Sequence, residues 1–402
     1  MTLEECKERE KIYACWLCNF PYIGNGQIHR LSELCGGPEG VYLAKPEIWG
    51  NVLSPQQTAR LKEYTANWRP EKSYHEIQAK GIRIVTVKDT DYPDRLREIS
   101  DAPYCLFVKG KLPDEEAPAV AVIGARECSE YGKYVANLLG RVLGKYKVTV
   151  ISGMARGIDG ISQMAALEAG GSSIGVLGCG VDICYPAQNK ALYERLIREG
   201  GVISSYPLST PARPQNFPPR NRIVSGLADV IIVVEARIKS GTLITVDMAL
   251  EQGREVYVVP GRVTDRLSDG CNRLIRQGAG VLWNLEEFVE ELWAIRNRKK
   301  GNCHVRMSNS NLCWDSGMKT EKEQYNPYCG GAEMGTAKII KLSSELTSIY
   351  EVLDFSPQSA EEIRGKLAGK FEERQIMMLL MELCVEKMAI QISPGRFCRG
   401  KG

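Results

Sequence analysis

The chain has 402 residues, about 2.7 domains at ~150 residues each, so one large domain with smaller flanking domains is expected. Hydrophobic residues at 44% and charged residues at 25% are typical of a globular protein and exclude a disordered or collagen-like chain. The net charge of +3 gives no sign of a nucleic-acid partner. No apolar run approaches the ~20 residues of a membrane span, and the charged N-terminus is unlike a signal peptide. We therefore expect a cytoplasmic protein with no membrane partner.

The N-terminal segment, residues 1–75, is predicted to be a helical domain. Its helices are expected at residues 6–20, 26–34 and 54–66, the last with Ser54 as N-cap and proline at the first helical position. The Gly-x-Gly turn at residues 24–26 could offer backbone N–H groups to a phosphate, or be a simple turn between helices.

Residues 76–295 show continuous apolar strands alternating with helices, which indicates a doubly wound, mostly parallel, Rossmann-like sheet covered on both faces. Strands are predicted at residues 82–87, 104–108, 119–123, 148–151, 173–177, 201–204, 230–234 and 256–259. Helices are predicted at residues 131–143, 157–169, 188–198 and 243–252.

Beyond this core the sequence predicts a linker and a small module. Residues 296–337 lack periodicity and begin with a basic run, which is typical of a linker. Residues 338–402 are expected to form three helices and a hairpin, the pattern of a winged helix. The third helix opens with Glu372 and Glu373 and later carries Glu382 and Glu386, so we expect contact with protein rather than with duplex DNA.

Metal and cofactor chemistry have little support in the sequence. Cys15 and Cys18 form the one close cysteine pair and are interpreted as apolar positions on a helix. The three histidines lie far from the glycine-rich motifs, which disfavours a histidine-based triad or metal centre. A similarly weak metal candidate is the irregular set Cys303, Cys313, Cys329 and His304. We predict no metal and no cofactor.

Three glycine-rich loops follow predicted parallel strands, where open sheets of this kind bind ligands. They are residues 124–126, 152–160 and 178–182, and the first two carry Arg126 and Arg156. Glycine permits close approach to a phosphate, and arginine adds charge and forked donors. Each loop alone could be a tight strand-to-helix turn; together they favour a phosphate-binding surface. No Gly-x-Gly-x-x-Gly or Walker motif is present.

Residues 200–228 contain five prolines and no acidic residue. We interpret the segment around Asn216–Arg222 as an exposed, stiffened loop in which Phe217 stacks on a base and basic side chains contact phosphate. A buried phenylalanine in a structural loop is the alternative. Ser240 and Thr242 in a further cluster could cap a helix or contact a ligand, and Asn272 and Arg273 could reach the same ridge.

These motifs, in this order over residues 80–282, resemble those of the DNA-processing protein A family (DprA/Smf). The matching segments include Val122–Arg126, Ser152–Asp159, Gly175–Asp182, Phe217–Ile223, Ser240–Thr245 and Gly270–Ala279. Two departures are Ala125, where the family usually has serine, and Ser205, where it usually has glutamate. The N-terminal helices resemble the family's sterile-alpha-motif-like extension.

The resemblance implies a non-enzymatic protein that binds and protects single-stranded DNA and loads the RecA recombinase onto it. It also implies a homodimer formed through the Rossmann-like domain. The DNA-binding residues it implies are Gly124, Arg126, Arg156, Gly157, Phe217, Arg220, Asn221 and Arg222, with Lys190 as a lesser candidate.

No nucleophile–base pair is evident, so no catalytic residue is predicted. Asp159 is expected to cap a turn or to order Arg156. The alternative is a nucleotide-binding sensor or a phosphoribohydrolase-like enzyme, for which Glu235 is the best available acid.

Overall fold

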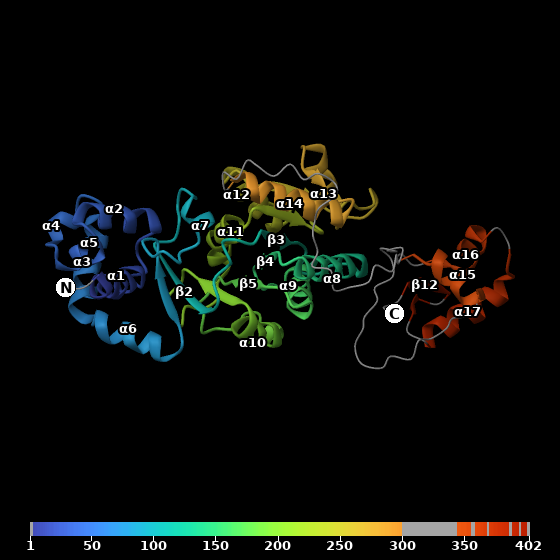
Figure 1. The fold of residues 1–402 in the computed structure, drawn as a ribbon, viewed down its shortest axis with the longest axis horizontal. Coiled ribbons are helices and arrows are strands. Elements are labelled where there is room, and N and C mark those ends of the chain that lie inside the picture. The colour runs from blue at the N-terminus through green and yellow to red at the C-terminus, as the bar shows by residue number, and fades with distance from the viewer. Residues whose placement is uncertain are drawn as a thin grey trace, which may run out of the picture. The chain divides into compact units, whose positions relative to one another are not determined.

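The computed structural model describes residues 3–299, 344–354, 358–367, 370–385, 388–393 and 395–399 (Figure 1). It divides into two compact units, Met1–Val305 and Arg306–Gly402. Residues 300–337 of the predicted linker, with Cys303, Cys313, Cys329 and His304, lie outside the described residues. None of the helices in the described ranges is long and apolar enough to cross a membrane.

The first unit begins with six helices. They are α1 (Leu3–Cys18), α2 (Asn25–Cys35), α3 (Pro38–Leu43), α4 (Pro46–Trp49), α5 (Pro55–Asn67) and α6 (Pro70–Ala79). Ser54 caps α5 as predicted, because its side chain accepts the Gln57 N–H. Trp16 and Leu61 are fully buried among these helices, whereas Cys15 belongs to a core shared with the sheet. Cys15 and Cys18 both lie on α1, as predicted, and are free thiols.

A nine-stranded sheet follows in the order β1-β2-β6-β5-β4-β3-β7-β8-β9. Its strands are β1 (Arg83–Thr86), β2 (Cys105–Gly110), β3 (Ala119–Ile123), β4 (Thr149–Ser152), β5 (Ser173–Val176), β6 (Gly201–Ser204), β7 (Val230–Val233), β8 (Glu255–Val258) and β9 (Gly280–Val281). Seven neighbouring strands of the sheet are parallel to one another: β6, β5, β4, β3, β7, β8 and β9. Strand β2 pairs with β6 in the antiparallel direction. The predicted doubly wound, mostly parallel sheet is confirmed.

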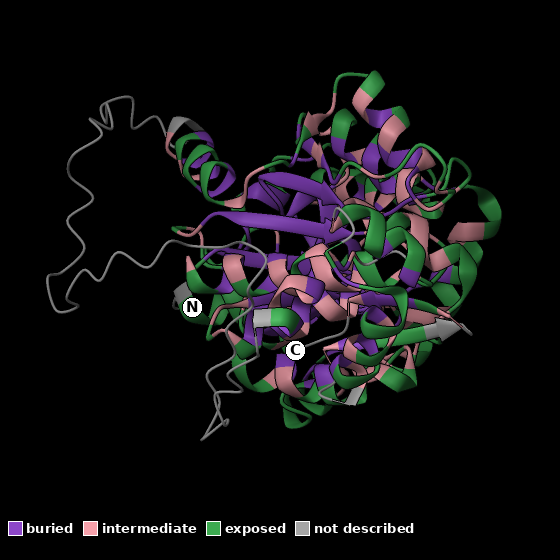
Figure 2. Cartoon of the chain, turned by 90° about the vertical axis from the view of Figure 1, so that its right-hand side faces the viewer, coloured by how far each residue is buried: buried purple, intermediate pink, exposed green. Residues whose placement is uncertain are grey.

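Helices cover both faces of this sheet. They are α7 (Asp94–Arg97), α8 (Glu130–Lys145), α9 (Ile158–Glu168), α10 (Lys190–Glu199), α11 (Phe217–Gly226), α12 (Gly241–Glu251), α13 (Asp269–Arg276) and α14 (Leu285–Lys299). Along β3, Val120 and Val122 pack in one apolar cluster and Ala121 and Ile123 in another. The central strands are buried throughout (Figure 2), which explains why their sequences are apolar at every position.

The strand order places a topological switch point beside β3. From β3 the chain moves through β4 and β5 to β6 on one side, and then returns to form β7 on the other side of β3. The connections that leave β3 and β7 therefore diverge to opposite sides. In open sheets of this kind the resulting crevice, beyond the carboxyl ends of the strands, is where ligands bind.

Two segments differ from the predictions. The prediction of an exposed loop around Phe217 is wrong from Phe217 onward, because residues 217–226 form helix α11. Its prolines lie in the first turn, where a helix has no use for their missing N–H groups. Helix α14 extends to Lys299, into the predicted linker. Its Arg296 is buried and pairs with Asp229 and Glu115, so that residue belongs to the core.

The second unit contains α15 (Ser344–Val352), α16 (Ala360–Lys366) and α17 (Glu373–Val385). A three-stranded antiparallel sheet, β10 (Gln358–Ser359), β12 (Arg396–Arg399) and β11 (Ala389–Ser393), completes it. The helices pack around Ile349, Ile376 and Phe397. Three helices followed by a hairpin is the order that the sequence predicted.

Candidate functional site

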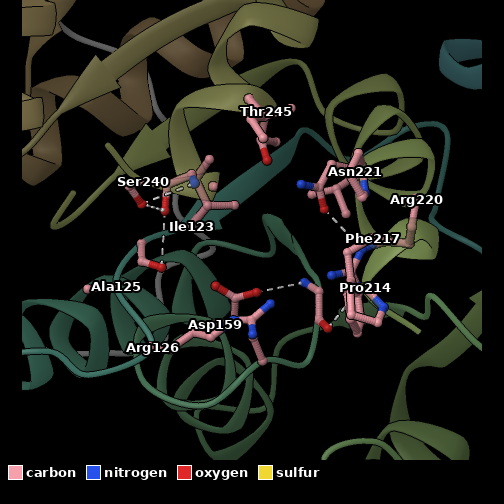
Figure 3. A pocket seen from close by; sticks show the side chains of 18 of the residues that line it. Ile123, Ala125, Arg126, Asp159, Pro214, Phe217, Arg220, Asn221, Ser240 and Thr245 are labelled. Carbon is pink, nitrogen blue, oxygen red and sulfur yellow. Dashed lines mark hydrogen bonds between the residues drawn. The ribbon is translucent and has the colours of Figure 1, made fainter. Parts of the chain in front are cut away.

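A cavity of about 500 Å³ lies beyond the carboxyl ends of β3 and β4, between α11 and α12 (Figure 3). Its walls come from the loops after β3 and β4, from the first turns of α11 and from the start of α12. The residues that line it include Gly124, Ala125, Arg126, Gly153, Asp159, Tyr185, Phe217, Arg220, Asn221, Ser240, Gly241, Thr242 and Thr245. The cavity thus occupies the crevice that the switch point creates.

Close packing between the loops after β3 and β4 explains two glycines, Gly124 in the cavity lining and Gly157 outside it. A Cβ on Gly124 would lie 2.7 Å from the Ile158 side chain. Gly157 has φ +75°, and a Cβ there would lie 2.3 Å from the Ala125 carbonyl oxygen. The loops after β3 and β4 can therefore touch only because both positions lack a side chain.

The polar and aromatic face of the cavity is formed by Arg126 and Phe217. The Arg126 guanidinium lies 5.5 Å from the centre of the Phe217 ring. Arg126 is exposed, and it forms no ion pair with any residue that the structure describes. The Tyr185 ring lies 5.7 Å from Phe217 at an interplanar angle of 30°. This group offers a cation and two ring faces to a ligand.

Arg220 has a structural position beneath the cavity. It is only 5% exposed, and its Nη1 donates to the carbonyl oxygens of Gly153, at 2.8 Å, and Val176. Its Nε donates to Asn221 Oδ1 at 3.1 Å. Burial lowers the pKa of Arg220, while the charge of nearby Asp159 raises it. The guanidinium therefore links the carboxyl ends of β4 and β5 by hydrogen bonds. Its carbon Cζ lies 5.6 Å from the centre of the Phe217 ring.

Asp159, like Arg220, forms its hydrogen bonds within the protein. Its carboxylate accepts the Gly153 N–H at 3.1 Å and so caps the loop after β4. Burial raises the pKa of Asp159, and the nearby charge of Arg220 opposes that rise. Of the two predicted roles, capping is what the geometry shows; Arg156 is exposed at this loop.

Four of the predicted residues lie outside the cavity lining: Arg156, Gly157, Lys190 and Arg222. Lys190 Nζ lies 3.9 Å from Glu194 on the exposed side of α10. Arg222 pairs with Asp101, and its Nη1 lies 3.2 Å from Glu251 Oε2. Gly124, Arg126, Phe217, Arg220 and Asn221 do come together at the cavity. For all nine residues, contact with DNA stays a prediction.

Tyr185 and Thr245 also line the cavity, although neither is among the predicted DNA-binding residues. Tyr185 is 41% exposed and follows the third glycine-rich loop, which is the signal that could have identified it. Ser240 caps α12 by accepting the Thr242 N–H at 3.2 Å, and it also lines the cavity, so both of its predicted roles are geometrically possible. Asn272 instead bonds the backbone of Gly261.

Glu235 follows β7 outside the cavity lining, and its carboxylate contacts Ser129, the N-cap of α8. Its carboxylate accepts hydrogen bonds from the Ser129 N–H, at 3.0 Å, and from the Ser129 hydroxyl. Burial raises the pKa of Glu235, and these hydrogen bonds oppose the rise. Within the described residues, no cluster of histidine, cysteine, aspartate and glutamate is arranged to hold a metal ion.

Comparison with known proteins agrees with the motifs. The family model for DNA recombination-mediator protein A matches residues 83–293, so the chain belongs to this family. It is 41% identical over 207 residues to the DNA processing protein DprA of Streptococcus pneumoniae, covering 51% of this chain and 73% of that protein. It is 39% identical over 213 residues to DprA of Bacillus subtilis, covering 53% and 72%.

The fold matches as well. The X-ray structure of DNA processing protein A from Streptococcus pneumoniae superimposes with a TM-score of 0.62 at 34% identity. The match covers 70% of this chain and 97% of that one.

Proposed function

We propose that the cavity binds single-stranded DNA without catalysing a reaction on it. The observation that carries this proposal is the pairing of exposed Arg126 with the ring of Phe217 at the switch-point crevice. A cation beside an aromatic face binds a phosphate and an adjacent base together. The names of the relatives, which describe DNA processing, agree with a DNA ligand.

The position of Phe217 favours single strands over duplex. Its ring is half-buried in a cavity, so a base must leave a stack to reach it. Single strands present unstacked bases at little cost, whereas a duplex must first be opened. Arg156, exposed in the loop after β4, and Lys190, exposed at the start of α10, would contact phosphates farther along the strand.

The absence of catalysis is part of the same proposal. Asp159, the one carboxylate in the cavity lining, and Glu235, the acid that the alternative reading needs, are each held by hydrogen bonds from the protein. The one hydroxyl that bonds Glu235, that of Ser129, caps α8 and lies outside the cavity lining. A phosphoribohydrolase-like enzyme would need a carboxylate free to act on a glycosidic bond, so this alternative has less support.

Recombinase loading and dimerisation extend the proposal. The description of the family as recombination mediators supports a role in delivering the bound strand to the RecA recombinase. A homodimer through the Rossmann-like domain is supported by the short edge strand β9 and its exposed apolar side chains: Val281 in the strand is 38% exposed, and Trp283 just after it is 72% exposed. We propose a winged helix for the second unit, with exposed Met378 and Met381 on α17 favouring contact with protein.

Fluorescence anisotropy with a labelled dT20 strand and a matched duplex tests the DNA proposal. We expect salt-sensitive binding with preference for the single strand, and a loss of about tenfold in affinity with Arg126→Ala. Arg141→Ala is the control, because Arg141 is an exposed arginine that pairs with Glu168 outside the cavity lining and is not among the predicted DNA contacts. Equal losses in the two variants, or release of free base from a nucleotide, would contradict the proposal.

A further inference from the structure

Two loops at the carboxyl ends of β7 and β8 form one continuous surface next to the cavity. They are residues 236–240 and 261–268, which we call the β7–β8 loop surface. The Ala236 N–H donates to the Leu267 carbonyl oxygen at 2.8 Å, and the Gly270 N–H donates to the Ala236 carbonyl oxygen at 2.8 Å. These backbone bonds hold the loops side by side.

This surface is strongly basic. It carries four cations, Arg237, Lys239, Arg262 and Arg266, and a single acid, Asp265. The Asp265 carboxylate accepts a hydrogen bond from the Leu267 N–H at 2.9 Å, which stabilises the turn within its own loop. Arg237, Lys239 and Arg266 are exposed and form no ion pair with any described residue. Such unneutralised cations attract polyanions.

Exposed apolar side chains lie among these cations. Ile238, between Arg237 and Lys239, is 47% exposed, and Val263 in the second loop is 89% exposed. Side chains of this kind in a basic surface can cover the sugar or the base of a bound strand, which a purely ionic surface does not do.

The surface is continuous with the cavity. Lys239 directly precedes Ser240, and Ser240, Gly241 and Thr242 form the cavity wall opposite Phe217. Figure 3 shows Ser240 on the far side of the cavity from Phe217 and Asn221. A strand with one base at Phe217 can therefore leave over the start of α12 and meet the β7–β8 loop surface first.

We propose that the β7–β8 loop surface is a second nucleic-acid subsite, which binds the phosphates of a single strand as it leaves the cavity. The proposal rests on the proposed function of the cavity. Arg237, Lys239 and Arg266 neutralise about three phosphates, and Ile238 and Val263 cover the intervening sugars and bases. The subsite raises the affinity of long strands and leaves that of very short ones unchanged.

The test compares the full chain with the variant Arg237→Gln/Lys239→Gln/Arg266→Gln on dT4 and dT20 over 50–200 mM salt. For dT20 we expect the plot of log affinity against log salt to be about 2 units shallower, at ~0.7 per phosphate contact. The parent would then lose about 20-fold more affinity than the variant over this salt range. Binding of dT4 should be unchanged. The charge-matched control is Lys80→Gln/Lys145→Gln/Arg198→Gln, three exposed cations elsewhere on the same unit.

Each outcome decides the proposal. A dT20 slope equal to that of the parent or of the control variant overturns the subsite while leaving the cavity proposal intact. An equal loss for dT4 and dT20 also overturns it, because the three cations would then belong to the cavity. Absence of single-strand binding by the parent overturns the proposed function and the subsite together.

Discussion

Replacing Arg220 should destabilise the fold, although the sequence presents this residue as a DNA contact. Arg220→Ala removes the donors to the buried carbonyl oxygens of Gly153 and Val176. Leaving buried acceptors without partners costs about 1–3 kcal/mol per group. The change also removes the positive charge that favours ionised Asp159. We expect a loss of about 3 kcal/mol in the free energy of unfolding.

Urea denaturation followed by circular dichroism measures this loss. With a urea dependence of ~3 kcal/mol/M, a loss of 3 kcal/mol moves the midpoint of the first unit's transition by about 1 M. Arg126→Ala is the matched control, since its guanidinium is exposed, and should leave the midpoint unchanged. Adding Asp159→Asn to Arg220→Ala should recover part of the loss, because it removes the uncompensated buried charge.

An unchanged midpoint in Arg220→Ala would refute this reasoning. If that variant kept its stability and lost DNA affinity as strongly as Arg126→Ala, Arg220 would be a direct contact, as the sequence suggests. A full loss that Asp159→Asn does not reduce would show that the two carbonyl hydrogen bonds, rather than the charge, account for the effect.

Three further outcomes are expected. Phe217→Leu should weaken binding of single strands by about 1–3 kcal/mol in an anisotropy titration while Phe217→Trp retains it, because base stacking needs an aromatic ring; equal affinity of the two variants would contradict stacking. Gly157→Ala should lower the thermal midpoint more than Gly170→Ala, since both have positive φ but only Gly157 would place a Cβ against backbone, and equal shifts would count against the close approach. Burial raises the pKa of Glu235 above its ordinary value of 4.5, so the folded state binds this proton more tightly than the unfolded state. Stability from this group therefore falls as pH rises from about 4.5 through the raised pKa, and urea titrations should show Glu235→Gln gaining on the parent over that interval; a pH-independent difference would disprove it.

The sequence by itself determined most of the core. The β3 and β7 segments are apolar at every position, and only a strand buried on both faces tolerates that pattern. Turn-forming glycines and helix starts between them indicated the parallel, doubly wound order. The glycine-rich loops were placed at one edge of the sheet because all parallel strands end on the same side. Gly124 and Arg126 could be assigned to the cavity in this way.

Tertiary structure alone decided which arginine faces a ligand. The sequence predicts the same role, contact with DNA, for Arg126, Arg220 and Arg222. In the structure, Arg126 is exposed beside Phe217, whereas Arg220 is buried and donates to two carbonyl groups. Arg222, two residues on along α11, pairs with acids outside the cavity. Two consecutive prolines suggested a loop because proline breaks a helix interior, whereas the first turn of a helix accepts it.

The charge of the chain shows the same division. A net charge of +3 over 402 residues gave no indication of an anionic ligand. Folding brings the loops after β7 and β8 together, although some 20 residues separate them along the chain, and so concentrates exposed cations next to the cavity. Composition averages over the whole chain, whereas a ligand meets only the charges that the fold places on one surface.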